Sequence, residues 1–441
     1  MNKNRMNNKN SKVLILFLIT FTLVCAAGIA MVALYVGNND KVKAAGTSEM
    51  SDNVNDSKTA SARTDNSEQT NPLIEKQTES TASDETAGGT SKTADKVKGK
   101  YDDILADKTY MAQNGIYEKK ASSDDKITLT FAGDILFDSH YAVMSKLNGN
   151  GGTLENAIDP AALKIMNDSD IMMINNDFPY SDRGTPTEGK KYTFRADPAT
   201  VSYLTQMGAD IVSLANNHAY DYGADALMDT FSTLDGAGIP YVGAGANRDR
   251  AEMPISFIVN DTKITFISAT QIERNDVPDT KAATDTTPGV FRCMDDTRLL
   301  DDIKSAKADS DYVIVYIHWG TENEENTDWL QEKQAPEIAA AGADLIVGDH
   351  PHCLQRLDYV GGVPVIYSMG NFWFNSKTVN TGLLQYTINK NGTPDIKFIP
   401  CLQKDCKTTL LSRADGASLL DYMRNISQNV SIDADGNVTA K

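Results

Sequence analysis

The pattern of hydrophobic and polar positions divides the chain into three parts, and the first is a long apolar run. Residues 13–36 read VLILFLITFTLVCAAGIAMVALYV and contain no charged side chain. As a helix, this run would be about 36 Å long, enough to cross a hydrocarbon core of about 30 Å. Basic residues within 1–12 predict a cytoplasmic N-terminus. We expect a single-pass anchor with the rest of the chain extracellular; a cleaved signal peptide is the alternative.

The second part, residues 37–122, consists mainly of Ser, Thr, Asp, Glu, Lys, Asn and Ala. Such a composition buries too little apolar surface to offset the entropy lost on ordering, which predicts a disordered linker. A flexible chain of about 85 residues spans about 50 Å on average and would hold the following domain away from the membrane. The stretch from Tyr101 to Lys120 is a candidate cap on that domain.

In the third part, residues 123–441, runs rich in β-branched residues alternate with helical patterns. Strands are predicted to begin at Lys126, Asp170, Asp210, Asp311 and Ala343, and helices near Asp197, Gly223, Met294 and Leu330. Hairpins are predicted within residues 254–270, 357–374 and 382–400, with turns at Asn-Asp, Gly-Gly and Asn-Gly pairs. This alternation predicts an α/β domain with a central sheet, or two stacked sheets, flanked by helices.

Composition narrows the functional classes. The 441 residues carry 60 Asp and Glu against 42 Lys and Arg, a formal net charge of −18. Because phosphate binding draws on clustered Lys and Arg, we expect no nucleic-acid partner. The five Cys include no CxxC pair, which excludes a zinc ribbon and a disulfide-built scaffold. A local disulfide between Cys401 and Cys406 remains open.

Polar residues follow the predicted strands at the point where each strand ends. The strand ends read Gly133-Asp134, Asn175-Asn176-Asp177, Asn216-Asn217-His218, His318-Trp319-Gly320 and Asp349-His350-Pro351-His352. In α/β sheets, ligand-binding and catalytic groups gather at the carboxyl ends of the strands. Four of the five His of the chain lie at such ends, so we expect them to share one site.

The residue types at these strand ends suit a metal. Imidazole and carboxylate together favour Zn, Mn, Fe or Ni. An extended backbone at His350-Pro351-His352 would point both imidazoles to the same side. The side chains that match this chemistry are Asp134, Asp177, Asn217, His218, His318, His350 and His352. For any one of the four histidines, the alternative is a buried histidine without a ligand role.

Two further residues near these strand ends allow more than one role. His218 could donate a proton to a leaving group, and Asp221 could orient its imidazole. Asp221 could equally cap the helix predicted near Gly223. Glu322, four residues after His318, could be a ligand, an acceptor beside a ligand, or a loop residue.

The ordered motifs resemble those of the CapA family, the poly-γ-glutamate capsule biosynthesis proteins. The resemblance covers about Lys126 to Lys407 and rests on FAGDILF, the NND strand end, YTFRADP, GADIVSLANNHAYDYG, YVIVYIHWGTE, GADLIVGDHPHCLQ and VIYSMGNFWF. The family is similar in fold to the calcineurin-like metallophosphatases. The resemblance therefore implies a four-layer αββα sandwich at the outer face of the membrane, acting on a γ-linked glutamate polymer of the envelope.

The resemblance also implies roles for individual residues. Asp134 would be a metal ligand, Asp177 a bridging carboxylate, Asn217 an amide ligand and His218 the proton donor, with His318, His350 and His352 as the remaining imidazoles. The usual Asp-x-His of the first motif reads Asp134-Ile135-Leu136 here, unless His140 replaces the missing ligand. Asp177 and Asp349 stand where Glu and His are frequent. One or two divalent ions, Mn, Zn or Fe, are thus implied.

Two functions follow from the resemblance. The first is a metal-dependent hydrolase that cleaves a phosphoester or γ-glutamyl bond in the polyanionic envelope polymer or its precursor. The second is a non-catalytic partner of that polymer or of a membrane-bound polymer synthase. For substrate binding we expect Arg195, Glu322 and His140. Arg195 belongs to a short basic run with Lys190 and Lys191, for which a solvated loop is the alternative.

Overall fold

The computed structural model describes residues 98–273, 280–390 and 392–441. The predicted membrane anchor, residues 13–36, and most of the predicted linker lie outside these ranges. None of the helices within them combines the length and apolar character needed to cross a bilayer.

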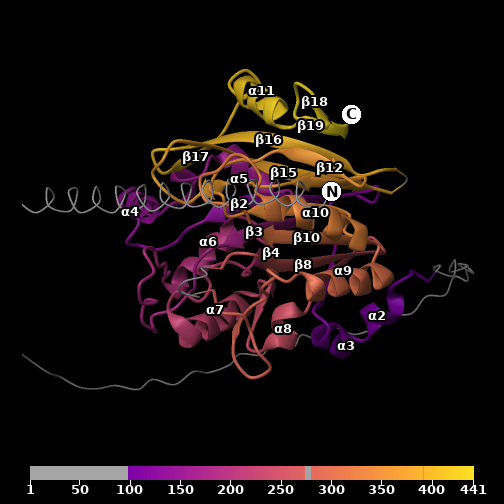
Figure 1. Cartoon of the computed structure of the whole chain (residues 1–441), viewed down its shortest axis with the longest axis horizontal. Helices are drawn as coiled ribbons and strands as arrows, with labels where there is room; N and C mark the ends of the chain where they lie inside the picture. The colour runs from indigo at the N-terminus through magenta and orange to yellow at the C-terminus, as the bar shows by residue number, and fades with distance from the viewer. Residues whose placement is uncertain (1–97, 274–279, 391) are drawn as a thin grey trace, which may run out of the picture. The chain divides into compact units, whose positions relative to one another are not determined.

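Two large sheets carry the described part of the chain (Figure 1). The first has the order β1 (Ile116–Lys119), β7 (Ile255–Val259), β8 (Thr262–Thr270), β10 (Tyr312–His318), β11 (Leu345–Asp349), β13 (Val363–Ile366) and β12 (Leu357–Val360). The second has the order β18 (Val430–Ile432), β19 (Asn437–Ala440), β16 (Asp395–Lys404), β15 (Val379–Asn389), β2 (Lys126–Ile135), β3 (Ile171–Asn176), β4 (Ile211–Ser213) and β5 (Tyr241–Val242). β14 (Asn371–Trp373) pairs with β2, β17 (Lys407–Leu410) pairs with β16, and β6 (Ala244–Gly245) pairs separately with β9 (Gly289–Val290).

The two sheets pack face to face. One apolar cluster joins Phe131 and Met173 of the second sheet to Phe266, Tyr316 and Val347 of the first. These strands contain near-continuous runs of buried residues, as expected for strands that are covered on both faces. Of the two arrangements that the sequence left open, two stacked sheets is therefore the correct one.

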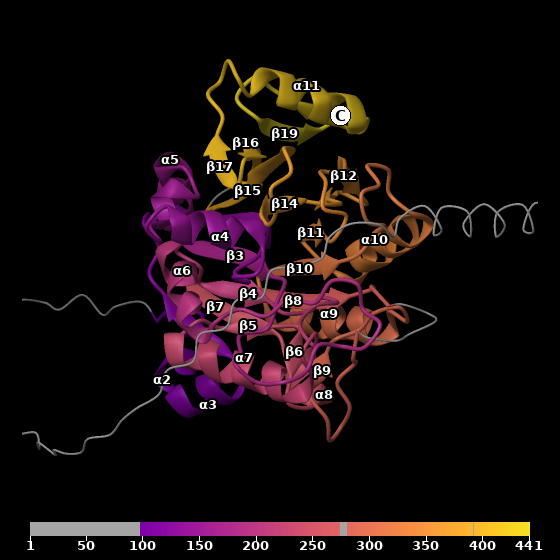
Figure 2. The same ribbon diagram turned by 90° about the vertical axis from the view of Figure 1, so that its left-hand side faces the viewer.

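Helices cover the outer faces of both sheets (Figure 2). On the second sheet lie α4 (Ala142–Gly149), α5 (Pro160–Asn167), α6 (Val201–Gln206) and α7 (Gly223–Ala237), with the short 3₁₀ turns Leu154–Asn156 and Pro198–Thr200. On the first lie α9 (Thr297–Asp309) and α10 (Trp329–Ala341), while α8 (Arg248–Glu252) contacts β6. The layers follow the order helix, sheet, sheet, helix, and the mixed α/β class is confirmed.

The folded domain begins earlier than the predicted boundary at residue 123. Residues 98–122 include α2 (Asp102–Ala106), α3 (Lys108–Gln113) and β1, which extends the first sheet parallel to β7. Asp261 accepts hydrogen bonds from the backbone N–H groups of Lys100 and Tyr101, at 2.8 and 3.0 Å. Asp311 accepts one from the Tyr101 hydroxyl at 2.8 Å. The linker prediction does not hold for residues 98–122, whereas the candidate cap from Tyr101 to Lys120 forms, because these carboxylates and a small apolar cluster hold the segment on the sheet.

The strands predicted at Lys126, Asp170, Asp210, Asp311 and Ala343 are β2, β3, β4, β10 and β11. The hairpins β7–β8, β12–β13 and β15–β16 also form, although residue 391 of the last turn lies outside the described residues. α4 and α5 were not predicted. The C-terminal α11 (Ala417–Ile426) packs with β18 onto the core between the sheets. Cys401 and Cys406, whose pairing was open, are free thiols.

Gly133 is required where β2 meets β14. A Cβ atom at this position would lie 1.8 Å from the carbonyl oxygen of Gly370, closer than any real contact. The N–H of the next residue, Asp134, donates to that same carbonyl at 3.0 Å. The glycine thus lets the two strands approach closely at the point where the polar strand end begins.

Candidate functional site

The carboxyl ends of parallel strands from both sheets meet at one place. β2, β3 and β4 run parallel in the second sheet, and β8, β10 and β11 run parallel in the first. His318, the last residue of β10, joins the two sets of strand ends. Its Nε2 lies 2.9 Å from Asn217 Oδ1 and 3.1 Å from His350 Nδ1. Its Nδ1 lies 3.3 Å from Asn175 Nδ2.

A second group of contacts surrounds Asp134 at the end of β2. Its Oδ1 accepts a hydrogen bond from Asn175 Nδ2 at 2.6 Å, and its Oδ2 lies 3.1 Å from His352 Nδ1. The same His352 nitrogen lies 2.9 Å from Asn371 Oδ1. Asn175 contacts both Asp134 and His318, so it links this group to the first. Asn371, the first residue of β14, was not among the predicted site residues, although it belongs to the VIYSMGNFWF motif.

Asp177 is a completely buried carboxylate of this site whose two oxygens both lack a hydrogen-bond partner among the described residues. The nearest recorded basic atom is His318 Nε2, 3.9 Å from Oδ1. Burial, and then the negative charge of Asp134, raise the pKa of Asp177 well above its ordinary value. A buried carboxylate without a donor is the arrangement that a bound cation would stabilise.

The backbone at the two neighbouring histidines is not extended, contrary to the prediction. His350 has φ = 100° and His352 has φ = 59°, values that side-chain-bearing residues rarely adopt. A tight turn after β11 therefore presents the two rings, whose centroids are 5.9 Å apart. Both imidazoles still reach the cluster, His350 towards His318 and His352 towards Asp134. Backbone strain of this kind is concentrated at functional sites.

The electrostatic environment favours neutral imidazoles at two of these positions. Burial, followed by repulsion from neighbouring imidazoles, lowers the pKa of His318 and His350 well below the ordinary value. Burial also opposes protonation of His352, but the contact with Asp134 outweighs it and raises the pKa of His352. A neutral imidazole is the form that can bind a metal ion.

His218 and Asp221 form a pair beside this cluster. His218 Nδ1 lies 2.7 Å from Asp221 Oδ2, and Lys190 Nζ lies 2.6 Å from Asp221 Oδ1. The backbone N–H of Phe194 also donates to Asp221, at 2.7 Å, and its ring lies 4.2 Å from the His218 ring between centroids. Burial raises the pKa of Asp221 to about 7, although Lys190 opposes the shift. Asp221 therefore holds His218, and the alternative that it caps the helix is wrong, because the N-cap residue of α7 is Tyr222 and no side chain caps this helix start.

The segment that contains the predicted basic run lies over this pair rather than in solvent. Lys190 keeps only 7% of its side-chain surface exposed. Arg195 stacks on Tyr222, with its guanidinium carbon 4.3 Å from the ring centroid, and its backbone N–H donates to Asp138. The solvated-loop alternative is thus wrong for Lys190. Arg195 borders the site without contacting the histidine cluster.

Two other predicted substrate-binding residues lie outside the cluster. The His140 side chain is 80% exposed and bonds to Asp138, so it does not take the place of the missing first-motif histidine. Glu322 is exposed, although its charge acts on Asp177 and His352.

Asp349 adds a further buried carboxylate that sequence reasoning treated only as a departure from the family pattern. It is completely buried at the end of β11 and accepts a hydrogen bond from the Tyr316 hydroxyl at 2.8 Å. Burial, and then the charge of Asp134, raise its pKa well above the ordinary value. Its position as the last strand residue before His350 was the signal that could have identified it.

The donor set fits a divalent cation in chemistry, but not as a finished ligand shell. Among the described residues, no three His, Cys, Asp or Glu side chains are placed to hold one ion together. The convergent atoms include the amide oxygens of Asn217 and Asn371, which complete a mixed set of imidazole, carboxylate and amide donors. The unpartnered Asp177 carboxylate is the observation that favours a cation here.

Comparisons with known proteins agree with the motifs. Residues 128–376 match the family described as "Bacterial capsule synthesis protein PGA_cap". The PGA biosynthesis protein CapA of Bacillus subtilis is 30% identical over 286 residues, which cover 64% of this chain and 73% of that protein. The capsule biosynthesis protein CapA of Bacillus anthracis is 30% identical over 292 residues, which cover 64% and 68%.

Among solved structures, a Staphylococcus aureus protein described as a candidate 5'-nucleotidase, in complex with α-ketoglutarate, aligns with a TM-score of 0.38 at 15% identity. The alignment covers 68% of this chain and 57% of that chain, and a likeness of this size supports no statement about activity. The family match spans more than half of the chain and includes the strand ends described above. The chain therefore belongs to the bacterial capsule synthesis protein PGA_cap family.

Proposed function

We propose that this chain acts in the biosynthesis of a poly-γ-glutamate capsule or envelope polymer, as a metal-dependent hydrolase. Its family membership and the names of the two Bacillus relatives support the biosynthetic context. Hydrolase activity is supported by one observation. Carboxylate, amide and imidazole groups meet in a buried cluster, and the Asp177 carboxylate within it has no hydrogen-bond donor among the described residues.

One or two divalent ions, Mn, Zn or Fe, fit this donor set. Asp177, Asn217, His318 and His350 would hold an ion on one side, and Asp134 and His352, with Asn371, on the other. A bound ion of this kind would supply a more acidic water and would stabilise the negative charge that develops during hydrolysis. Neutral His318 and His350 are ready to act as ligands without losing a proton first.

His218 supplies the proton in this proposal. Burial, and then Lys190, lower the pKa of His218, whereas burial raises the pKa of Asp221 to about 7, so in this proposal the pair shares one proton. With the protonated Asp221 donating to Nδ1, Nε2 carries the proton that passes to the leaving group, and Nδ1 takes the proton of Asp221 in its place. Lys190 and the backbone N–H of Phe194 fix the Asp221 carboxylate, and the Phe194 ring packs against the imidazole. These contacts hold the ring in one orientation and limit the access of water. The bond cleaved is a phosphoester or a γ-glutamyl amide.

A non-catalytic partner of the polymer or of a membrane-bound polymer synthase is the second candidate. Two observations favour it. The first motif lacks its histidine and the exposed His140 does not replace it. In addition, the described residues hold no ready set of three charged or imidazole ligands.

Metal analysis and hydrolysis assays on the purified full-length chain separate the two candidates. We expect bound metal in the natural chain and in H140A, and reduced metal in H318A, which removes the histidine that joins the two sets of strand ends. We expect metal-loaded protein to hydrolyse a phosphodiester or a γ-glutamyl substrate, and the double variant N217A/H218A to be inactive. Equal rates in that variant and the natural chain would refute the hydrolase. Capsule production that persists with the double variant in cells would favour the non-catalytic role.

We also propose that residues 13–36 anchor the chain in the cell membrane, with the folded domain outside. Their uncharged run and the basic residues before it support this placement. Protease added to intact protoplasts should then degrade the domain. Protection of the domain until the membrane is permeabilised would contradict the proposal.

A further inference from the structure

Two buried asparagines lie beside the candidate site, at the carboxyl ends of neighbouring strands. In the register of the second sheet, Asp134 of β2 pairs with Asn175 of β3, and Asn175 pairs with Ser213 of β4. Asn216 follows shortly after the end of β4. Asn175 and Asn216 are 0% and 1% exposed, and neither was among the predicted site residues. Because water does not reach them, their amide groups need partners within the protein.

Asn216 is oriented by backbone groups. Its Oδ1 accepts hydrogen bonds from the backbone N–H groups of His218 and Ala219, at 3.1 and 2.8 Å. Its Nδ2 donates to the backbone carbonyl of Asn176 at 3.0 Å. A backbone N–H can only donate and a carbonyl can only accept, so these partners fix which end of the amide carries the oxygen. The same bonds hold the turn that carries Asn217 and His218.

Asn175 takes its orientation from Asn216. Asn216 Nδ2 also donates to Asn175 Oδ1, at 3.1 Å. Asn175 Nδ2 therefore faces the other way, where it donates to Asp134 Oδ1 at 2.6 Å and lies 3.3 Å from His318 Nδ1. The hydrogen bonds run in one direction, from Asn216 through Asn175 to Asp134, and buried bonds in such a chain strengthen one another.

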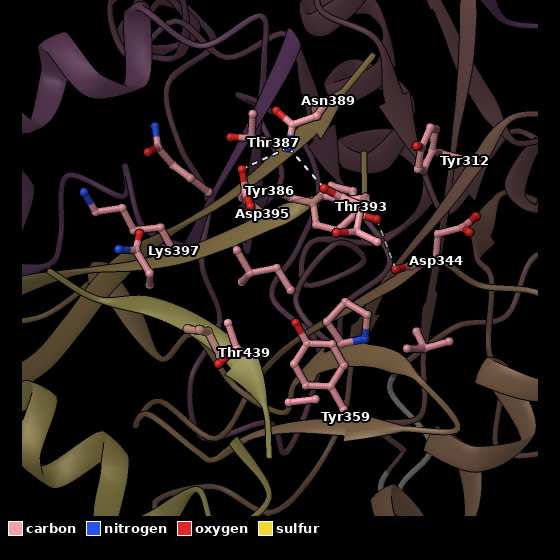
Figure 3. A pocket seen from close by; sticks show the side chains of 18 of the residues that line it. Tyr312, Asp344, Tyr359, Tyr386, Thr387, Asn389, Thr393, Asp395, Lys397 and Thr439 are labelled. Atoms are coloured by element: carbon pink, nitrogen blue, oxygen red, sulfur yellow. Dashed lines mark hydrogen bonds between the residues drawn. The ribbon is translucent and has the colours of Figure 1, made fainter. Parts of the chain in front are cut away.

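A ligand in the large cleft of the protein would not contact these two amides. The cleft has a volume of about 940 Å³ and lies at the other end of the strands, beside Lys126 and Tyr312, the first residues of β2 and β10 (Figure 3). Neither Asn175 nor Asn216 is among the described residues that line it. What the two amides do therefore follows from the groups that they hold.

We propose that Asn175 and Asn216 are positioning residues, which set the place of His218 relative to Asp134 and His318. Asn216 holds the turn that carries the proton donor, and Asn175 holds the carboxylate on the other side. The roles of the three positioned groups rest on the proposed function, whereas the hydrogen bonds between them involve no metal. Partners that orient a ligand without being one are typically worth about 10–100-fold in metal affinity or activity.

The ¹⁵N resonances of the histidine rings, recorded on the full-length chain in mild detergent with EDTA, test this inference without metal. His352 Nδ1 lies 3.1 Å from Asp134 Oδ2, so its signals, assigned with H352Q, report the position of that carboxylate. Asn216 bonds to neither residue in the described part of the chain. We expect N216A to shift the His352 signals by way of Asn175, N175A to shift them as well, and N175A/N216A to shift them no further than N175A. Unchanged His352 signals in N216A, or a further shift in the double variant, would overturn the inference.

The matched control is N176A. Asn176 is also completely buried at the end of β3, but its side chain donates to the backbone carbonyl of Phe178, at 2.6 Å. The control loses a similar hydrogen bond, and we expect it to leave the His352 signals in place. An equal shift in N176A would overturn the inference, because any loosening of the strand end would then have the same effect. Should N216A fail to fold, N216S gives the same comparison, because its hydroxyl can accept from the turn but is too short to reach Asn175.

Binding of Mn²⁺, measured from the electron paramagnetic resonance signal of the free ion, separates this inference from the proposed function. We expect N175A and N216A to weaken binding by about 10–100-fold, and N176A to bind as the natural chain does. Equal affinities in the natural chain and all three variants would overturn the inference. A natural chain that binds no Mn²⁺ would refute the cation proposal, and the His352 signals would still decide whether the two amides position Asp134.

Discussion

Replacing Asp177 by Asn tests the cation proposal, because the change keeps the shape of the side chain and removes its charge. The carboxylate is completely buried and has no donor among the described residues. Leaving such a group uncompensated costs about 1–3 kcal/mol. In EDTA at pH 8, we therefore expect D177N to be more stable than the natural chain by about that amount. At about 2 °C per kcal/mol, the midpoint of thermal unfolding should rise by about 2–6 °C.

With metal present, we expect the natural chain to be more stable than D177N. At MnCl₂ concentrations of 100 times the dissociation constant, a bound ion stabilises the natural chain by about 2.7 kcal/mol. If loss of the charged ligand weakens binding about 100-fold, the same MnCl₂ stabilises the variant by only about 0.4 kcal/mol. Thermal unfolding followed by circular dichroism, with EDTA and with MnCl₂, measures both effects.

Asp170 provides the matched control. It is also buried, but both of its oxygens accept backbone hydrogen bonds, from Ser122 at 2.6 Å and Thr128 at 2.7 Å. In D170N, the side-chain N–H₂ group faces a backbone N–H group, so two donors meet and one hydrogen bond is lost. This variant should lower the free energy of unfolding by about 1.5–3 kcal/mol with or without metal. A destabilised D177N in EDTA, or an equal response of D177N and the natural chain to MnCl₂, would show that Asp177 is not a cation ligand.

Three further predictions concern the scaffold. Burial, and then the charge of Glu252, raise the pKa of Asp302 to about 6. The neutral carboxyl therefore contributes its full stability below about pH 4, and this contribution is lost as the pH rises through 6. D302N should gain about 1 kcal/mol at pH 7.5 in urea unfolding, and nothing near pH 4; equal gains at both pH values would contradict this assignment. D311N weakens the contacts of Asp311 with Lys100 and Tyr101, which hold residues 98–122 on the first sheet. Trypsin should therefore cleave after Lys100 faster than in the natural chain. An unchanged rate would show that this segment stays in place without the carboxylate. G133A should lower stability by more than about 3 kcal/mol, whereas G149A, whose added Cβ meets nothing, should be tolerated; a stable G133A would contradict the close strand approach.

The sequence predicted the strands and their polar ends because both depend on local pattern. A buried parallel strand requires an unbroken apolar run, and the run that precedes Asp134 or His318 is visible without a structure. The placement of these ends at one edge follows from the handedness and direction of α/β connections. For this reason His318, Asn217 and Asp134, from distant segments, could be expected in one place.

The remaining features depend on tertiary contacts that no local pattern encodes. The positive φ angles of His350 and His352 arise from a turn that brings both rings back to the cluster, whereas local spacing suggested an extended strand. Lys190 lies in a polar segment that resembles a solvated loop, and contacts with the distant Asp221 carboxylate and the Asn217 carbonyl oxygen explain its burial. The folded start of the domain at residues 98–122 likewise depends on carboxylates more than one hundred residues away.

Anomalous X-ray scattering at the manganese edge, from crystals of the full-length chain grown with MnCl₂, shows whether the buried cluster binds a metal ion. We expect one or two peaks, each within bonding distance of ligands from the set Asp134, Asp177, Asn217, His318, His350 and His352. Crystals with no peak at this cluster, or with a peak only elsewhere on the molecule, would contradict it.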